Sequence, residues 1–91
     1  MIKIYSILDK VPGIYSNPFY LKSNAVALRE IKYLINEDKN QNIFNTNIKD
    51  KALYCLGEYN EETGLIKSND KPEFIINLID LKEDSNNEQQ N

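Results

Sequence analysis

Only one segment of this 91-residue chain has the periodicity of an amphipathic α-helix. Ser23 and Asn24 offer a helix cap, and the segment 25–38, AVALREIKYLINED, follows it directly. At 100° per residue, one stripe of this segment is apolar and the opposite side is polar or small. The apolar stripe comprises Ala27, Leu28, Ile31, Leu34 and Ile35, and the opposite side comprises Ala25, Arg29, Lys32 and Asn36.

The rest of the chain is typical of short β-strands separated by turns. Segments 2–9, 14–15, 19–21, 52–59, 65–67 and 73–81 are rich in β-branched and aromatic residues. Turns are predicted at 10–13, 60–64 and 68–71, and Asn17-Pro18 interrupts the second strand. Segment 39–50 is expected to be a loop that Ile43 and Phe44 anchor to the core. The pattern predicts one α+β domain over residues 1–81, with an antiparallel sheet of four to five strands and one helix packed on a face. Residues 82–91 are expected to form a disordered acidic tail.

The first and the last predicted strands are apolar on both sides. Ile2, Ile4 and Leu8 alternate with Tyr5 and Ile7, and Phe74, Ile76 and Leu78 alternate with Ile75, Ile79 and Leu81. A single helix of about three turns covers one side of a sheet only. We therefore expect the second side to contact another copy in a homodimer, or another partner. The alternative is that loop 40–50 folds over it.

The composition argues against catalysis and points to an intracellular protein. Histidine is absent, and the single cysteine, Cys55, lies in mid-strand, where a small core residue is expected. Glu58, Glu61 and Glu62 lack the spacing of a calcium loop, and no phosphate-binding glycine motif occurs. We expect no enzyme activity, no cofactor and no metal. The apolar runs are too short to span a bilayer, and the N-terminus does not resemble a signal peptide, so a cytoplasmic protein without membrane contact is expected.

The charge distribution leaves nucleic-acid binding open. The net charge is −3, but residues 1–60 carry eight basic and six acidic residues, whereas residues 61–91 carry three and eight. Proteins that bind single-stranded nucleic acid combine cations with aromatic rings. The candidate contact residues of this kind are Lys3, Tyr5, Lys22, Arg29, Lys32 and Tyr33. Equally, tyrosines are common in sheets, and a basic helix face can simply be solvated.

The order of motifs between residues 4 and 66 resembles the small nonstructural protein of gokushovirus-type microviruses, which are single-stranded DNA phages. Asn24, Ala25 and Arg29 match the start of that family's helix. A second motif is matched by Tyr54, Leu56, Gly57, Tyr59, Asn60, Thr63 and Gly64.

The resemblance implies a nonstructural accessory protein in the host cytoplasm that binds single-stranded DNA or modulates viral DNA replication and packaging. The alternative is a protein–protein adaptor that engages a phage or host replication factor through the exposed sheet face. An antirestriction-like factor is a third and weaker option. The matched glycines and asparagines have structural explanations as turn and cap residues.

Overall fold

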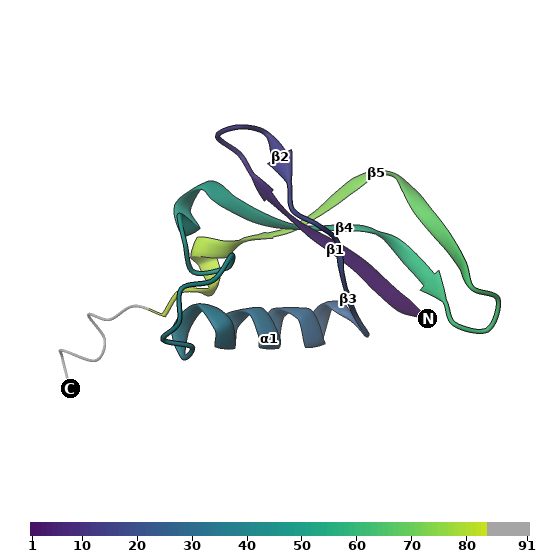
Figure 1. Cartoon of the computed structure of the whole chain (residues 1–91), viewed down its shortest axis with the longest axis horizontal. Coiled ribbons are helices and arrows are strands. Elements are labelled where there is room, and N and C mark those ends of the chain that lie inside the picture. The colour runs from purple at the N-terminus through teal and green to yellow at the C-terminus, as the bar shows by residue number, and fades with distance from the viewer. Residues whose placement is uncertain (84–91) are drawn as a thin grey trace.

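The computed structural model describes residues 1–83 and contains one sheet and one α-helix (Figure 1). The strands are β1 (Ile2–Asp9), β2 (Ile14–Tyr15), β3 (Phe19–Leu21), β4 (Lys51–Asn60) and β5 (Leu65–Asn77). The helices are α1 (Asn24–Asn36) and two short 3₁₀ segments, η1 (Ile48–Asp50) and η2 (Leu78–Leu81). The predicted tail falls almost entirely on residues 84–91, which lie outside the described part of the chain.

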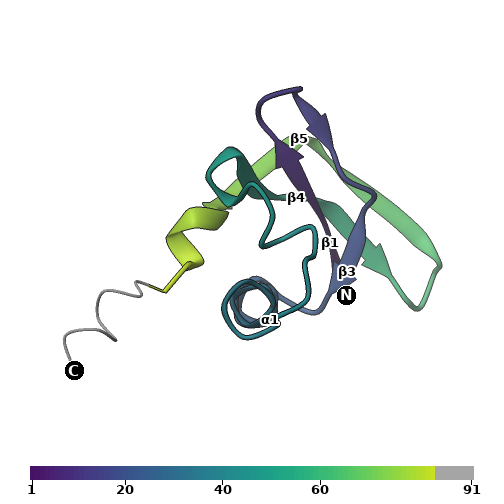
Figure 2. The same ribbon diagram turned by 60° about the vertical axis from the view of Figure 1, so that its left-hand side comes forward.

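The sheet is antiparallel throughout, with the strand order β2-β1-β4-β5, and β3 also pairs with β1. Helix α1 runs along one side of the twisted sheet, and no second helix covers the other side of it in the described residues (Figures 1 and 2). This architecture confirms the predicted fold class, an α+β domain with a five-stranded sheet and one helix on a face.

The helix forms where its apolar stripe predicted. The Ser23 hydroxyl accepts a hydrogen bond from the backbone N–H of Val26, which caps the first turn as expected. Ala27, Ile31 and Ile35 of the stripe are buried. They pack in one core cluster with side chains from β1, β4 and η2, namely Tyr5, Ile7, Leu53, Cys55 and Leu78. The core therefore lies between α1 and one side of the sheet, and Cys55 is a core residue, as predicted.

Two hairpin turns share the same local chemistry. The Asp9 carboxylate accepts a hydrogen bond from the Val11 N–H, and the Asn60 side chain accepts one from the Glu62 N–H. Four residues after Asp9, Gly13 donates its N–H to the Asp9 carbonyl, and four residues after Asn60, Gly64 donates its N–H to the Asn60 carbonyl. Both glycines have a φ of 74°. This left-handed conformation favours glycine, so Gly13 and Gly64 fix both turns. The predicted turns at 10–13 and 60–64 are confirmed.

The predicted turn at 68–71 is wrong, because β5 runs unbroken from Leu65 to Asn77. The predicted last strand also ends early, since residues 78–81 form η2. Strand β5 lies at the edge of the sheet, where proline and polar residues are tolerated because one side of the strand needs no hydrogen-bond partner. The pairing with β4 shifts register here, and the Asn69 side chain donates to the Cys55 carbonyl at a distance of 3.0 Å.

The segment between α1 and β4 packs on the helix side of the sheet. The side chains of Asn42 and Asn45 both donate to the Leu34 carbonyl of α1. Phe44 is half-buried against the core and contacts Phe19 edge-to-face, with ring centroids 5.7 Å apart. Ile43, the second predicted anchor, is 43% exposed. This loop therefore does not cover the second side of the sheet, and that alternative is wrong.

Candidate binding surfaces

Three of the six candidate contact residues lie together on α1. Arg29, Lys32 and Tyr33 line one shallow hollow, whose rim also includes Asn36, Glu37 and Glu83. Tyr33 is 58% exposed, so its ring is accessible to a ligand. The Lys32 amine lies 3.9 Å from the Glu83 carboxylate, and both side chains are more than half exposed, so this ion pair contributes little stability. We call these three residues the helix surface.

Lys3 and Lys22 lie near the N-terminus of the chain, and both have acidic neighbours. Lys3 pairs across the sheet with Glu58, and Glu58 pairs with Lys67. The pKa of the Glu61 carboxyl lies below its ordinary value, first because its own backbone N–H donates to it. The N-terminal ammonium, 3.4 Å away, and Lys22 add to this effect. The two lysines therefore do not form an unopposed basic patch.

Tyr5 is the candidate that the structure removes from any binding surface. Its side chain is fully buried, and its hydroxyl donates to the Asn24 side-chain oxygen at 2.6 Å. Its ring stacks on Phe19 with a centroid distance of 6.0 Å. Burial, then the nearby Cys55 and Glu73, raises the pKa of Tyr5 to about 12. A ring in this position cannot stack on a base, so Tyr5 is a core residue.

Alternation along the strands places a second surface on the side of the sheet that faces away from α1. Tyr5, Ile7, Leu53 and Cys55 point toward α1, so their alternating neighbours point the other way. We call this side the open face. A row of three aromatic rings crosses it from β2 to β5, and its members are Tyr15, Tyr54 and Phe74.

The rings of the aromatic row contact one another edge-to-face. The centroid distances are 5.6 Å between Tyr15 and Tyr54 and 5.7 Å between Tyr54 and Phe74. Tyr15 is 40% exposed and Phe74 is 51% exposed. The sequence predicted two apolar sides for the first and the last strands, and only Phe74 of this row lies in one of them. It did not show that the three rings meet, because Tyr15 and Phe74 are 59 positions apart.

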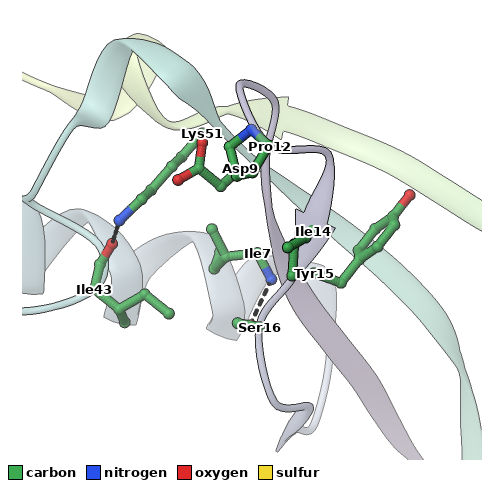
Figure 3. Close-up of a pocket in the computed structure, with 8 residues that line it drawn as sticks. All are labelled: Ile7, Asp9, Pro12, Ile14, Tyr15, Ser16, Ile43 and Lys51. Atoms are coloured by element: carbon green, nitrogen blue, oxygen red, sulfur yellow. Dashed lines mark hydrogen bonds between the residues drawn. The ribbon is translucent and has the colours of Figure 1, made fainter.

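A third feature is a mostly apolar hollow beside the turn between β1 and β2 (Figure 3). Ile7, Pro12, Ile14, Tyr15 and Ile43 supply its apolar lining, and Asp9, Ser16 and Lys51 complete it. The Lys51 amine donates to the Ile43 carbonyl at 2.8 Å, and the Ser16 hydroxyl accepts from the Ile7 N–H at 2.9 Å. Both polar groups thus hold the surrounding segments in place.

Within residues 1–83, no three His, Cys, Asp or Glu side chains gather in a group that could hold a metal ion. No helix in that part of the chain is both long enough and apolar enough to cross a membrane.

These features define a small α+β protein in which, within residues 1–83, a helix covers one side of the sheet and the other side is open. Comparison with protein families identifies it further: the model of the family described as "Phage ORF5 protein" matches residues 2–81. The chain belongs to this family and is a bacteriophage protein. No curated protein and no solved structure matches the chain significantly. The family confirms the phage origin that the motifs between residues 4 and 66 predicted.

Proposed function

We propose that this protein is a non-enzymatic accessory protein of a gokushovirus-type microvirus. In this proposal it binds single-stranded DNA in the host cytoplasm and supports viral DNA replication or packaging. The family match supports a phage accessory protein, and the motif resemblance supports the narrower viral group.

The observation that carries DNA binding is the grouping of two cations and one ring on the helix surface. Arg29, Lys32 and Tyr33 line the same hollow and are all exposed. Backbone phosphates are bound by guanidinium and ammonium groups, and an exposed tyrosine ring offers a stacking partner for a base. Each element of this recognition is present within two turns of one helix.

The neighbouring carboxylates set the expected strength of binding. Glu37 and Glu83 share the rim of the hollow, and the whole chain carries a net charge of −3. Both repel phosphate, so the affinity is expected to be low and to depend strongly on salt.

The test is fluorescence anisotropy with a labelled oligothymidine, titrated at several salt concentrations. Arg29→Ala combined with Lys32→Ala should weaken binding at low salt. It should also make the plot of the logarithm of the association constant against the logarithm of the salt concentration less steep by about 1.4, since each lost phosphate contact on a single strand contributes about 0.7. Tyr33→Ala should weaken binding without changing that slope, because it removes a ring and no charge.

The matched control is Lys39→Ala combined with Lys49→Ala, which removes the same charge at two exposed positions outside the hollow. Equal weakening by the control would show that only net charge matters and would exclude the helix surface as a site. An absence of binding by the wild-type protein at low salt would reject the proposed function.

A second candidate function is a protein–protein adaptor for a phage or host replication factor. The apolar hollow of Figure 3 favours it, because Ile14 in its lining is 65% exposed, and Val11, which precedes the lining residue Pro12 in the chain, is 76% exposed. The adaptor function predicts that the tagged protein captures a replication protein from nuclease-treated infected cells and that Ile14→Lys abolishes capture. Capture that is unchanged in Ile14→Lys would argue against this hollow.

A further inference from the structure

The open face extends well beyond its aromatic row. Tyr59 of β4 and Ile66 of β5 pair with each other and lie on the same side of the sheet as Tyr54 and Phe74. Ile66 is 59% exposed. The hairpin of β4 and β5 that carries this pair stands away from the body of the domain (Figure 1). The open face is therefore an elongated apolar surface that reaches from β2 to the tip of the hairpin.

Some side chains of the open face are already buried, although they lie outside the core around α1. Ile4 and Ala52 point away from α1 and are 6% and 1% exposed, yet neither belongs to the core cluster around the helix. Ser6 on the same side is fully buried and hydrogen-bonds to Ser16. The aromatic row thus rests on an ordered, well-packed sheet, which suits a rigid contact surface.

The charges along the paired positions of the sheet are strongly asymmetric. The charged residues at these positions all alternate to the helix side, and they are Lys3, Asp9, Lys51, Glu58, Lys67 and Glu73. The paired positions on the open face are uncharged, and they are Ile2, Ile4, Ser6, Leu8, Tyr15, Tyr20, Ala52, Tyr54, Gly57, Tyr59, Ile66, Ser68, Phe74 and Asn77.

This distribution of charge indicates which kind of binding partner the open face suits. A polyanion needs several cations, and the cation seen to reach this side is Lys10, whose amine donates to the Asn77 side chain at 2.9 Å. A basic partner would need carboxylates, and the paired positions offer none. A second copy, in contrast, meets an apolar surface whose paired positions carry no charge, so these positions of two copies can face each other without like-charge repulsion, although each copy carries a net charge of −3.

We propose that the open face is the interface of a homodimer, in which two copies meet sheet to sheet. The two aromatic rows then form the centre of the interface, because large aromatic side chains contribute most to such contacts. The dimer gives each sheet the second covering layer that residues 1–83 do not supply themselves.

The free edge of β5 is a poor alternative interface. Lys67, Lys71 and Pro72 lie along it, and lysine and proline on an edge strand hinder pairing with another strand. Contact through faces also leaves α1 of each copy on the outside, so the helix surfaces of both copies remain accessible. The dimer proposal therefore does not depend on DNA binding.

The test is the mass of the 91-residue wild-type protein in solution, measured by sedimentation equilibrium. We expect a dimer of twice 10.6 kDa. Phe74→Lys and, separately, Tyr15→Lys should each raise the dimer dissociation constant at least about tenfold. Tyr33→Lys is the matched control, because it replaces an exposed ring on the opposite side of the domain with the same charged side chain, and it should leave the dimer unchanged.

Circular dichroism establishes that each variant is folded. The thermal midpoint of the wild type provides a second readout, since it should rise with protein concentration in a dimer. A wild-type monomer whose thermal midpoint does not depend on concentration would overturn the proposal. A wild-type dimer that stays intact in both Phe74→Lys and Tyr15→Lys would also overturn the proposal. The same holds if these variants lose DNA or protein binding while their mass in solution stays that of the dimer.

Discussion

At the scale of single residues, Gly57 marks a close approach between β4 and β5. A Cβ atom at this position would collide with the Lys67 carbonyl oxygen and would lie 2.9 Å from the Cα of Ser68. Both obstacles belong to the backbone of β5, so neither can rotate away. The glycine of the Tyr-x-Leu-Gly motif thus has a packing role.

We expect Gly57→Ala to reduce the free energy of unfolding by about 2 to 4 kcal/mol, because β5 must shift to admit the methyl group. Urea denaturation measures this loss. Gly13→Ala is the comparison, since nothing lies within 4 Å of its added Cβ and only the positive φ opposes it. Its expected cost is about 1 kcal/mol. Equal losses in the two variants would contradict the packing role of Gly57.

Tyr5 links the core to the pH dependence of stability. Its pKa rises from the ordinary value of 10 to about 12 in the folded protein, so the folded state holds the phenolic proton more tightly. The stabilisation is complete below pH 10 and is lost as the pH rises from 10 toward 12.

We expect the wild type to lose roughly 2 kcal/mol more stability than Tyr5→Phe over this pH range. Below pH 10, Tyr5→Phe should cost about 1 kcal/mol, because it removes only the hydrogen bond to Asn24. Urea denaturation at a series of pH values tests both statements. Parallel pH profiles for the two proteins would show that Tyr5 does not titrate in this range.

At the scale of secondary-structure elements, the Asn36 side chain hydrogen-bonds α1 to the end of the described chain. The Asn36 amide donates to the Leu81 carbonyl at 2.8 Å, and its oxygen accepts from the Glu83 N–H at 2.8 Å. Helix α1 and the segment after η2 are thus connected by Asn36, and Leu78 of η2 fills the core between them.

Asn36→Ala should lower the free energy of unfolding by about 1 to 2 kcal/mol, because two backbone groups lose their partner. It should also accelerate amide hydrogen exchange at Glu83, which the side chain now protects. Asn17→Ala, at an exposed position between β2 and β3, is the control and should change neither quantity. Unchanged exchange at Glu83 in Asn36→Ala would mean that this contact does not hold the segment.

At the scale of the whole molecule, the two proposals respond to salt in opposite directions. Binding of DNA to the helix surface weakens with added salt, since released counterions drive it. Association of two copies through the apolar open face strengthens, because salt screens the repulsion between protomers with a net charge of −3 each.

Measurements of anisotropy and sedimentation in the same buffers, between low and physiological salt, should therefore diverge. The DNA dissociation constant should rise at least tenfold, and the dimer dissociation constant should fall or stay constant. A dimer that dissociates with added salt would indicate an interface built on ion pairs, in conflict with the open face.

The sequence alone determined the features that depend on local periodicity and local chemistry. The 3.6-residue period located α1 and its buried stripe, Ser23 located its cap, and Asn60 and Gly64 located a turn. Two-sided apolar strands with one helix also indicated that one side of the sheet would stay uncovered. These signals lie within a few residues of one another, so no knowledge of the fold is needed to interpret them.

Only the tertiary structure decided the features that join distant parts of the chain. It placed Tyr5 in the core and showed that Ser68–Lys71 continues a strand, because the position of β5 at an edge tolerates polar residues and Pro72. It also brought Tyr15, Tyr54 and Phe74 into one row. The physical reason is strand order and register: they fix which residues become neighbours, and they are set by packing between segments many positions apart.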